Sequence, residues 1–320
     1  MMRRKHIVVV GSVNLDLVGT AGRIPAPGET VMGKNFQVFH GGKGANQAVA
    51  VAKLGYPVRM VAKVGDDEFG ERLRRGLRDA GVNVSGVTTA KHTSSGVALI
   101  SLDTTGQNSI IVVSGANGKL LPQDIENALP TLRSASVILT QLESPLQTVE
   151  CLATVAARFQ IPLMLDPAPA RELPSRLFQY VTVLTPNETE TCVLCGIDAG
   201  KLNPSTAAEY AQELRQRGPE NVIIKMGDHG AYLAGNKGRG TFLPAFKVRV
   251  VDSTAAGDAF NGGLAVALMQ GQNLEKAARF ASAVAAVSVT RMGAQPSMPT
   301  AREVSRFLKE AASSPNGGAG

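Results

Sequence analysis

Short apolar runs alternate along the chain with longer segments in which apolar residues recur every three or four positions. The runs are almost continuously apolar, which is typical of strands covered on both faces. They predict strands at Ile7–Val10, Val58–Val64, Val137–Leu139, Pro162–Leu165, Val181–Leu184 and Val222–Lys225. The longer segments predict helices at Gly44–Leu54, Glu68–Ala80, Leu146–Phe159, Thr206–Arg217, Ala256–Gln270 and Leu274–Thr290, with another beginning near Thr300. This alternation predicts an α/β fold in which helices wrap a mainly parallel sheet.

Two stretches interrupt this alternation. Residues 14–40 are too many for a simple connection between a strand and a helix, and residues 96–113 contain two extended runs around a turn. Both predict hairpins inserted into the α/β body. Their place near the carboxyl end of the first strand would put a small β lid over the ligand crevice. We expect one domain over residues 1–312 and a disordered, Gly-rich tail over 313–320.

Composition excludes several classes of protein. The chain has 320 residues, of which 44% are hydrophobic and 18% charged, as in globular proteins rather than disordered or fibrous ones. A net charge of +7 is spread without long basic runs, and aromatic residues make up 4%. No nucleic-acid partner is expected, because such proteins usually combine a concentrated basic face with stacking rings. The surplus charge fits either a small anionic ligand or solubility alone.

The cysteines and the apolar segments indicate the cellular compartment of the protein. Cys151, Cys192 and Cys195 are too few for a disulfide framework and favour a reducing compartment. Cys192 and Cys195 have the spacing of half a zinc site, but no second pair accompanies them, and two small buried side chains are the better interpretation. No apolar run reaches 18 residues, so we expect no membrane span and a cytoplasmic location.

The segment Asp252–Gly263 carries the strongest chemical signal, because a turn of small and polar residues opens directly into an apolar helix. Free backbone N–H groups at such a helix start form a pocket for a phosphoryl group. Asp258 would lie beside that phosphate, and abstraction of a proton from an attacking hydroxyl would explain a carboxylate there. The alternative is that Asp252 is an ordinary N-cap and Asp258 a first-turn acid favoured by the helix dipole.

A second glycine-rich turn, His40–Asn46, enters the first predicted helix. Its glycines would let the backbone approach a ligand closely, and Lys43 and Asn46 could donate hydrogen bonds to hydroxyls or phosphate. The alternative is a turn that needs only positive φ angles. Polar residues also follow the predicted strands: Asn14, Asp16, Glu143, Asp166, Asn187 and Glu190. Each could be a cap or turn residue, but together they predict a site at the carboxyl edge of the sheet.

The chain resembles the ribokinase-like (PfkB-type) carbohydrate kinases over roughly Ile7 to Leu308. The segments that carry the resemblance are 11–16 (GSVNLD), 41–50 (GGKGANQAVA), 115–117 (GAN), 141–145 (QLESP), 166–170 (DPAPA), 185–190 (TPNETE), 252–261 (DSTAAGDAFN) and 293–296 (GAQP). The second and the seventh correspond to the two signature regions of the family and are highly specific together. The resemblance implies a three-layer α/β/α fold with a β-sheet lid that also forms a homodimer interface.

The resemblance also implies a reaction. Members of the family transfer the γ-phosphate of ATP to a hydroxymethyl group of a sugar, which would be O5 if the sugar is D-ribose. By this likeness Asp258 is the base on the attacking hydroxyl, and the anion hole consists of the backbone N–H groups of Ala255, Ala256 and Gly257. The residues expected to hold the sugar are Asn14, Asp16, Gly42, Lys43, Asn46 and Glu143, together with Asp258.

Sites for the nucleotide and for two metal ions are implied in the same way. Asn187 and Glu190 match the Asn-x-x-Glu motif of the family, which organises Mg²⁺ and phosphate through water. The residues expected to line the nucleotide site are Lys225, Met226, Gly227, Asp228, His229, Gly230 and Gly257, with Ser282 near the adenine. A potassium site is implied at Asp252, Thr254, Ser288, Arg291, Gly293 and Ser297.

Three residues depart from the family pattern. Ala255 stands where many members have Gly, and Asp166 stands where Asn is frequent. Lys225 begins Lys-Met-Gly in place of the commoner Thr-Leu-Gly, and its side chain could reach the ATP phosphates. A lysine at this position also resembles the sequence of ketodeoxygluconate kinases. The acceptor therefore stays open among ribose, deoxyribose, fructose, ketodeoxygluconate and a nucleoside. A further alternative is a sugar-binding regulator without activity, against which the presence of Asp258 argues.

Overall fold

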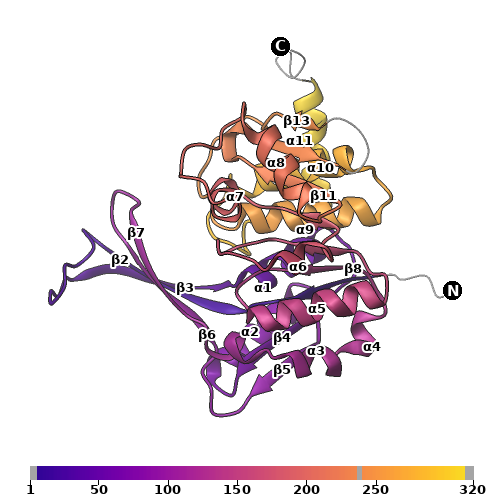
Figure 1. Cartoon of the computed structure of the whole chain (residues 1–320). Helices are drawn as coiled ribbons and strands as arrows, with labels where there is room; N and C mark the ends of the chain where they lie inside the picture. The colour runs from indigo at the N-terminus through magenta and orange to yellow at the C-terminus, as the bar shows by residue number, and fades with distance from the viewer. Residues whose placement is uncertain (1–5, 236–239, 314–320) are drawn as a thin grey trace.

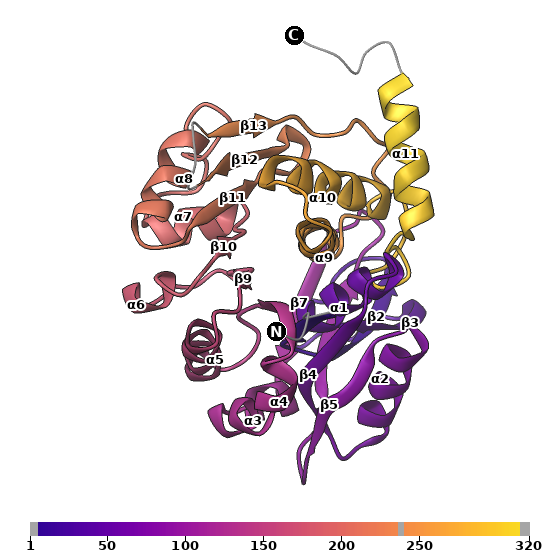
Figure 2. The same ribbon diagram turned by 90° about the vertical axis from the view of Figure 1, so that its right-hand side faces the viewer.

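A nine-stranded sheet runs through the middle of the computed structural model, which describes residues 6–235 and 240–313 (Figures 1 and 2). In spatial order its strands are β13 (Thr241–Leu243), β12 (Ala231–Ala234), β11 (Asn221–Lys225), β10 (Val183–Leu184), β9 (Leu163–Leu165), β8 (Ala135–Thr140), β1 (His6–Val10), β4 (Val58–Gly65) and β5 (Asn83–Ala90). All pairs from β5 to β11 are parallel, and β12 and β13 are antiparallel to their neighbours. The predicted, mainly parallel sheet is confirmed.

Strand β1 shows why its sequence is almost continuously apolar. Ile7 and Val9 belong to one apolar core, and Val8 and Val10 belong to a second core on the opposite face of the sheet. Because successive side chains of a strand point to opposite faces, a strand covered on both sides needs an apolar residue at every position.

Helices cover both faces of the sheet (Figure 2). Those that contribute to the first core are α1 (Lys43–Lys53), α2 (Glu68–Asp79), α9 (Ala256–Met269), α10 (Leu274–Ser288) and α11 (Ala301–Ser313). Those that contribute to the second core are α3 (Pro122–Asn127), α4 (Leu129–Leu132), α5 (Leu146–Arg158), α6 (Ser175–Phe178), α7 (Glu188–Cys195) and α8 (Ala207–Gln216). The three-layer α/β/α arrangement expected from the sequence is therefore confirmed.

Helix α9 is held firmly between two other helices. Every residue from Asp258 to Ala267 is buried. A Cβ atom on Gly262 would lie 2.6 Å from Ala50 Cβ of α1, and one on Gly263 would lie 2.9 Å from Val284 Cγ2 of α10. These two glycines therefore let the helices pack closely, and this packing fixes the start of α9 against α1.

Four strands form a second sheet, which we call the small sheet. It consists of β2 (Asn14–Ala21), β3 (Gly33–Gly41), β6 (Gly96–Leu102) and β7 (Asn108–Val113), in the order β3-β2-β6-β7. Each predicted hairpin is present, because β2 pairs with β3 and β6 with β7 in antiparallel fashion. The hairpins join through a parallel pairing of β2 with β6. The small sheet extends away from the α/β body (Figure 1).

Some elements have sequences without a clear strand or helix pattern. β5 has Asn, Ser and Gly among its residues and alternates in exposure at the edge of the sheet, and β12 and β13 form an antiparallel edge rather than a parallel unit. Helices α3, α4 and α6 have six residues or fewer, too short for a helical period. Ser313 ends α11, so the predicted tail 313–320 began one residue early; residues 314–320 lie outside the described part.

No helix within residues 6–235 and 240–313 is long and apolar enough to cross a membrane. The three cysteines are free thiols. Cys192 is buried in the second core and Cys195 is partly buried beside it, both on α7. This placement agrees with the interpretation of the pair as small apolar side chains.

Candidate active site

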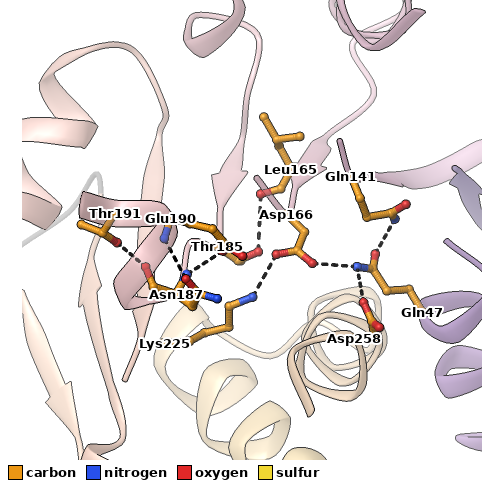
Figure 3. A network of polar contacts seen from close by, with 10 residues as sticks. All are labelled: Gln47, Gln141, Leu165, Asp166, Thr185, Asn187, Glu190, Thr191, Lys225 and Asp258. Carbon is orange, nitrogen blue, oxygen red and sulfur yellow. Dashed lines mark hydrogen bonds and ion pairs between the residues drawn. The ribbon is translucent and has the colours of Figure 1, made fainter. Parts of the chain in front are cut away.

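Polar residues from neighbouring strands meet at one edge of the central sheet (Figure 3). Gln141 follows β8, Asp166 follows β9, Asn187 follows β10, and Lys225 ends β11. Parallel strands present their carboxyl ends at a common edge, where open α/β sheets bind ligands. The start of α9 and the start of α1 face this edge and complete the candidate site.

Asp258 lies at the centre of the site, in the first turn of α9, and its side chain is buried. Asn46 Nδ2 donates to Asp258 Oδ2 over 3.0 Å, and Gln47 Nε2 donates to Asp258 Oδ1 over 3.1 Å. Burial raises the pKa of Asp258 to about 7, although Lys43 and the two amides act in the opposite direction. A carboxyl with this pKa is suited to accept a proton near neutral pH.

Lys43 and Glu143 lie on the side of the site where the sugar was expected. Glu143 Oε2 accepts from the backbone N–H of Lys43 over 2.9 Å and from the hydroxyl of Ser12. Burial lowers the pKa of the Lys43 ammonium, but the surrounding carboxylates, of which Asp258 acts most strongly, leave that pKa above its usual value. Lys43 is therefore a permanent cation in the middle of the site.

Asn14 and Asp16 stand on β2, at the base of the small sheet. Asn117 Nδ2 donates to Asn14 Oδ1 over 2.6 Å, which leaves the amino group of Asn14 to donate to a ligand. Burial, followed by the charge of Glu143, raises the pKa of Asp16 to about 6. Gly42 has φ +89°, and a Cβ there would lie 2.7 Å from the backbone nitrogen of Asn14, so the turn requires glycine.

The start of α9 has the features expected of an anion site. Ala255 is the N-cap, with φ 59° and ψ 16° in the left-handed region, and no side chain caps the helix. Only small residues, Ala255 to Gly257, cover the N–H groups of the first turn; Ala256 N–H also donates to Ser253 carbonyl over 3.2 Å. The alternative of Asp252 as N-cap is wrong, because that position belongs to Ala255.

Lys225 brings a second cation to this helix start. Its Nζ donates to Asp166 Oδ1 over 2.9 Å, and both side chains are largely buried. A Cβ on Gly257 would lie only 3.3 Å from Lys225 Nζ, which places the ammonium beside the first turn of α9. Asp166 Oδ2 in turn accepts from Gln47 Nε2 over 3.0 Å. An ionic network therefore joins the helix start to Asp258.

Asn187 and Glu190 form a reciprocal capping box at the start of α7. Glu190 N–H donates to Asn187 Oδ1 over 2.8 Å, and Asn187 N–H donates to Glu190 Oε2 over 2.7 Å. Asn187 and Glu190 thus form the capping box that their spacing in the sequence allowed. Burial raises the pKa of Glu190, which Lys225 partly offsets. Glu190 is buried close to the Asp166–Lys225 pair (Figure 3).

The remaining residues of the expected nucleotide site lie beyond Lys225. Met226 is buried in the second core, so only its backbone can face a ligand. Gly227, Asp228 and His229 form the exposed helical turn η2 (Gly227–His229), followed by Gly230 with φ +98°. Ser282 lies on α10, and its hydroxyl donates to Ala278 carbonyl of the same helix over 3.0 Å rather than to this segment.

The six residues of the expected potassium site belong to two segments that the fold joins. Asp252 accepts from Thr254 N–H over 2.9 Å and from Gly293 N–H over 2.8 Å. Ser288 and Ser297 donate to carbonyls of their own segments, and Arg291 extends to Glu303 over 2.6 Å. The Arg291 side chain is thus paired with a carboxylate, so only its backbone oxygen could serve a cation.

Several residues of the site were not assigned a role from the sequence. Ser12, Gln47 and Gln141 are neutral side chains inside segments quoted for the family resemblance. Nothing in their spacing shows that Ser12 contacts Glu143, that Gln47 contacts Asp258, or that Gln141 contacts Gln47. Asn117 was likewise only part of a motif. Their positions depend on contacts between residues more than 90 positions apart, which no local pattern encodes.

Fold and site together point to a class of enzyme, an α/β kinase with a buried carboxylate at a helix N-terminus. Residues 4–301 match the pfkB family carbohydrate kinase. The ribokinase of Bacillus subtilis is 42% identical over 305 residues, which cover 95% of this chain and 99% of that protein. The deoxyribokinase of Salmonella typhi is 39% identical over 303 residues, covering 94% and 98% respectively.

A solved structure of Arabidopsis thaliana ribokinase complexed with ribose and ATP has a TM-score of 0.90 and 34% identity. The match covers 96% of this chain and 99% of that one. The chain therefore belongs to the pfkB family of carbohydrate kinases, and the expected class of enzyme, an ATP-dependent sugar kinase, is confirmed.

Proposed function

We propose that this enzyme phosphorylates D-ribose at O5, using ATP and releasing ADP and ribose 5-phosphate. The observation that carries the mechanism is the buried carboxylate of Asp258, held by two amides at the uncapped start of α9. The choice of ribose is supported by relatives named ribokinase and by the structural relative complexed with ribose and ATP.

The reaction is an in-line phosphoryl transfer. Asp258 takes the proton of the attacking hydroxymethyl group, a new O–P bond forms to the γ-phosphorus, and the bond to the leaving ADP oxygen breaks. The N–H groups at Ala255, Ala256 and Gly257 and the ammonium of Lys225 stabilise the charge that develops on the phosphoryl oxygens.

The sugar would be held by complementary polar groups. Asn46 Oδ1 is buried and has no hydrogen-bond partner, so it is ready to accept from a hydroxyl. The amino group of Asn14 and the ammonium of Lys43 supply donors, and Asp16 and Glu143 supply acceptors. A ligand without these hydroxyls would leave buried polar groups unpaired, which is the physical basis of selectivity for a sugar.

The nucleotide would extend from the start of α9 along Lys225 to Gly230 towards Ser282. Mg²⁺ would neutralise charge on the phosphates. Within residues 6–235 and 240–313 no three His, Cys, Asp or Glu side chains form a metal cluster. This fits a magnesium ion that arrives with the nucleotide, since Mg²⁺ is usually held by one or two carboxylates, phosphates and water. Asn187 and Glu190 would orient that water.

The residues of the expected potassium site can also be compared with the ligands that the ion prefers. Potassium is a hard cation that prefers oxygen ligands, and the side chain and carbonyl oxygens of Asp252, Thr254, Ser288, Gly293 and Ser297 fit it, with the carbonyl of Arg291. Asp252 binds the two segments together through backbone N–H groups. A cation at this junction would hold the loop before α9 in place.

The small sheet would serve as the lid of the site and as the surface of a homodimer. Its strand β7 is exposed at every position, with a run of apolar residues from Ile110 to Val113. An exposed apolar strand of this kind needs a partner to cover it. The chain would act as one kinase domain, because both apolar cores pack on the same sheet. The free cysteines favour a reducing compartment such as the cytoplasm.

The direct test is a comparison of acceptors. ADP release would be measured with Mg·ATP and K⁺ for D-ribose, 2-deoxyribose, fructose, ketodeoxygluconate and adenosine. We expect ribose to lead by tenfold or more in kcat/KM, a difference of about 1.4 kcal/mol in transition-state binding. Deoxyribose is the second candidate, because a deoxyribokinase is 39% identical. A lead for deoxyribose, or no turnover at all, would overturn the choice of ribose.

The role of Asp258 has its own test. Asp258→Ala should lower kcat by about 10²–10⁴-fold, the usual contribution of a positioned base. The affinity for the sugar, measured by calorimetry, should change little. A variant with nearly normal kcat would show that Asp258 is not the base.

A further inference from the structure

A single amide lies between two buried carboxylates of the site, Asp258 and Asp166. Gln47 Nε2 donates one hydrogen to Asp258 Oδ1 over 3.1 Å and the other to Asp166 Oδ2 over 3.0 Å (Figure 3). The exposed fractions of Gln47, Asp258 and Asp166 are 1%, 3% and 4%, so water does not separate them. The amide therefore uses its whole donor capacity to hold the two carboxylates in one arrangement.

The orientation of this amide is itself fixed. Gln141 Nε2 donates to Gln47 Oε1 over 2.7 Å. If the Gln47 amide were reversed, its oxygen would face both carboxylates and its nitrogen would face the donor of Gln141. That arrangement would leave three unfavourable buried contacts, so Gln141 and the two carboxylates together allow only one orientation.

The second carboxylate is tied to the nucleotide side. Asp166 Oδ1 accepts from Lys225 Nζ over 2.9 Å, and this ammonium lies beside Gly257 at the start of α9. A continuous chain of contacts thus runs from Lys225 through Asp166 and Gln47 to Asp258. It links β11, the end of β9, α1 and α9. These contacts therefore fix the position of Asp258 relative to Lys225 on the phosphate side.

Charges from every side act on Asp258. Lys43 on α1 favours its ionised form, and Asp166 after β9 opposes it. Lys225 on β11 neutralises Asp166, while Glu190 on α7 and Glu143 after β8 lie around Lys43. Loss of either member of the Asp166–Lys225 pair would change the charge that Asp258 experiences, and the two losses would act in opposite directions.

We propose that Gln47 and the Asp166–Lys225 ion pair are positioning residues that hold Asp258 in line with the transferred phosphoryl group. This inference rests on the proposed function, since it assumes that Asp258 is the base. It gives a common role to two departures from the family pattern, Asp166 and Lys225, because the buried carboxylate and the buried ammonium neutralise each other. It also predicts that removal of Gln47 harms turnover more than binding.

The first experiment compares Gln47→Leu with Thr148→Val. Thr148 is a buried residue of α5 that donates to Leu120 carbonyl, so its variant also loses a buried hydrogen bond, but away from the site. Gln47→Leu should lower kcat by about tenfold to a hundredfold, as a misplaced catalytic group does, with less than a threefold change in KM for the sugar. Thr148→Val should keep kcat. A Gln47→Leu enzyme with kcat within twofold of the natural chain would overturn the proposal.

The second experiment uses the pH dependence of kcat in Asp166→Asn, Lys225→Met and the double variant. Asp166→Asn removes a negative charge, so the acid limb of kcat should move to lower pH. Lys225→Met leaves Asp166 unpaired, so the limb should move to higher pH, and the double variant should lie between. Limbs that stay in place, or that move in the same direction, would contradict the proposal even if Gln47→Leu fails to fold.

A readout without turnover separates this inference from the proposed function. The ¹³C signal of the Asp258 carboxyl group can be titrated in the natural chain and in the same variants. Opposite shifts of its midpoint in Asp166→Asn and Lys225→Met would support the network even if the acceptor proves not to be ribose. A natural chain that phosphorylates none of the sugars would overturn the proposed function, whereas equal midpoints in all variants would overturn the inference alone.

Discussion

At the scale of single residues, the site depends on a few carboxyl groups in unusual surroundings. Asp258 and Asp16 are acids of ordinary type, but burial raises the pKa of the first to about 7 and of the second to about 6. In both cases the protonated form is favoured because water is excluded. The unpaired oxygen of Asn46 adds a further buried acceptor that a ligand hydroxyl could satisfy.

These surroundings predict a pH dependence of activity. A base must be ionised to act, so kcat/KM for the sugar should fall with unit slope below pH 7, to about one tenth of its plateau at one unit below the pKa of Asp258. Below about pH 6 the slope should increase as Asp16 is protonated. Initial rates between pH 5 and 9 would measure this, with circular dichroism as control for folding. A profile that is flat to pH 5.5 would contradict it.

The raised pKa of Asp258 affects stability in the opposite direction, because its contribution to stability falls as the pH rises. In the unfolded chain Asp258 has an ordinary, low pKa, so the folded state binds its proton more tightly. The contribution of Asp258 to stability is therefore fully present below its unfolded pKa, near 4, and is lost as the pH rises through the folded value of about 7. The enzyme keeps a carboxylate where it lowers stability, as is common at functional sites.

At the scale of elements, the start of α9 combines strain with function. Ala255 adopts φ 59°, a left-handed conformation that costs a residue with a Cβ roughly 1–2 kcal/mol. Its small side chain does not cover the N–H groups of the first turn, of which that of Ala256 donates to the Ser253 carbonyl over 3.2 Å. The packing of α9 between α1 and α10 holds the strained residue in place.

Substitution of this residue should relieve the strain. Ala255→Gly should raise the free energy of unfolding by up to about 1 kcal/mol, because glycine tolerates the left-handed region, and should leave kcat within twofold. Urea unfolding would measure the change. Gly42→Ala is the matched control, since φ +89° and the contact with Asn14 make a side chain there destabilising. A less stable Ala255→Gly variant would show that the conformation is not strained.

The junction between Asp252 and the loop at Gly293 leads to a prediction about salt. If a potassium ion holds this loop against the segment before α9, replacement of Na⁺ by K⁺ at constant ionic strength should raise kcat. The reason is that Asp252 already joins the two segments through the N–H groups of Thr254 and Gly293, so an ion bound there would act on the loop before α9. Steady-state rates in the two salts would measure the effect. Identical rates would remove the proposed site.

At the scale of the whole molecule, the small sheet stands out from the body with an uncovered strand (Figure 1). Ile111 is 62% exposed, and the residues on either side of it are also apolar and exposed. Burial of such a strand against a second copy would stabilise a dimer through apolar contacts and strand pairing. The lid over the sugar would then be braced by the partner.

A charge on this strand should separate the copies. If β7 forms the proposed dimer interface, Ile111→Asp should shift the protein from dimer to monomer in sedimentation equilibrium, because a carboxylate would be buried without a partner. The control is Leu121→Asp, which alters an exposed apolar residue at the start of α3 in the α/β body. Equal masses for Ile111→Asp and the natural chain would argue against this interface.

The sequence alone was sufficient for the layers of the fold and for a set of candidate site residues. Apolar runs mark strands buried on both faces, so β1, β4, β8 and β11 were predictable, as were the longer helices. The two hairpins were recognisable because they interrupt the alternation. Edge strand β5 was not, since an edge position tolerates polar residues and glycine.

Only the tertiary structure decided how the residues of the site act together. Gln47 and Asp258 are 211 positions apart, and Lys225 reaches Asp166 from a strand 59 positions away. Composition and spacing identify Asp258 as a candidate base, because a helix start and an acid are local features. The pKa of that acid, the strain at Ala255 and the network through Gln47 arise from burial and from contacts between distant segments, which come into being only when the chain folds.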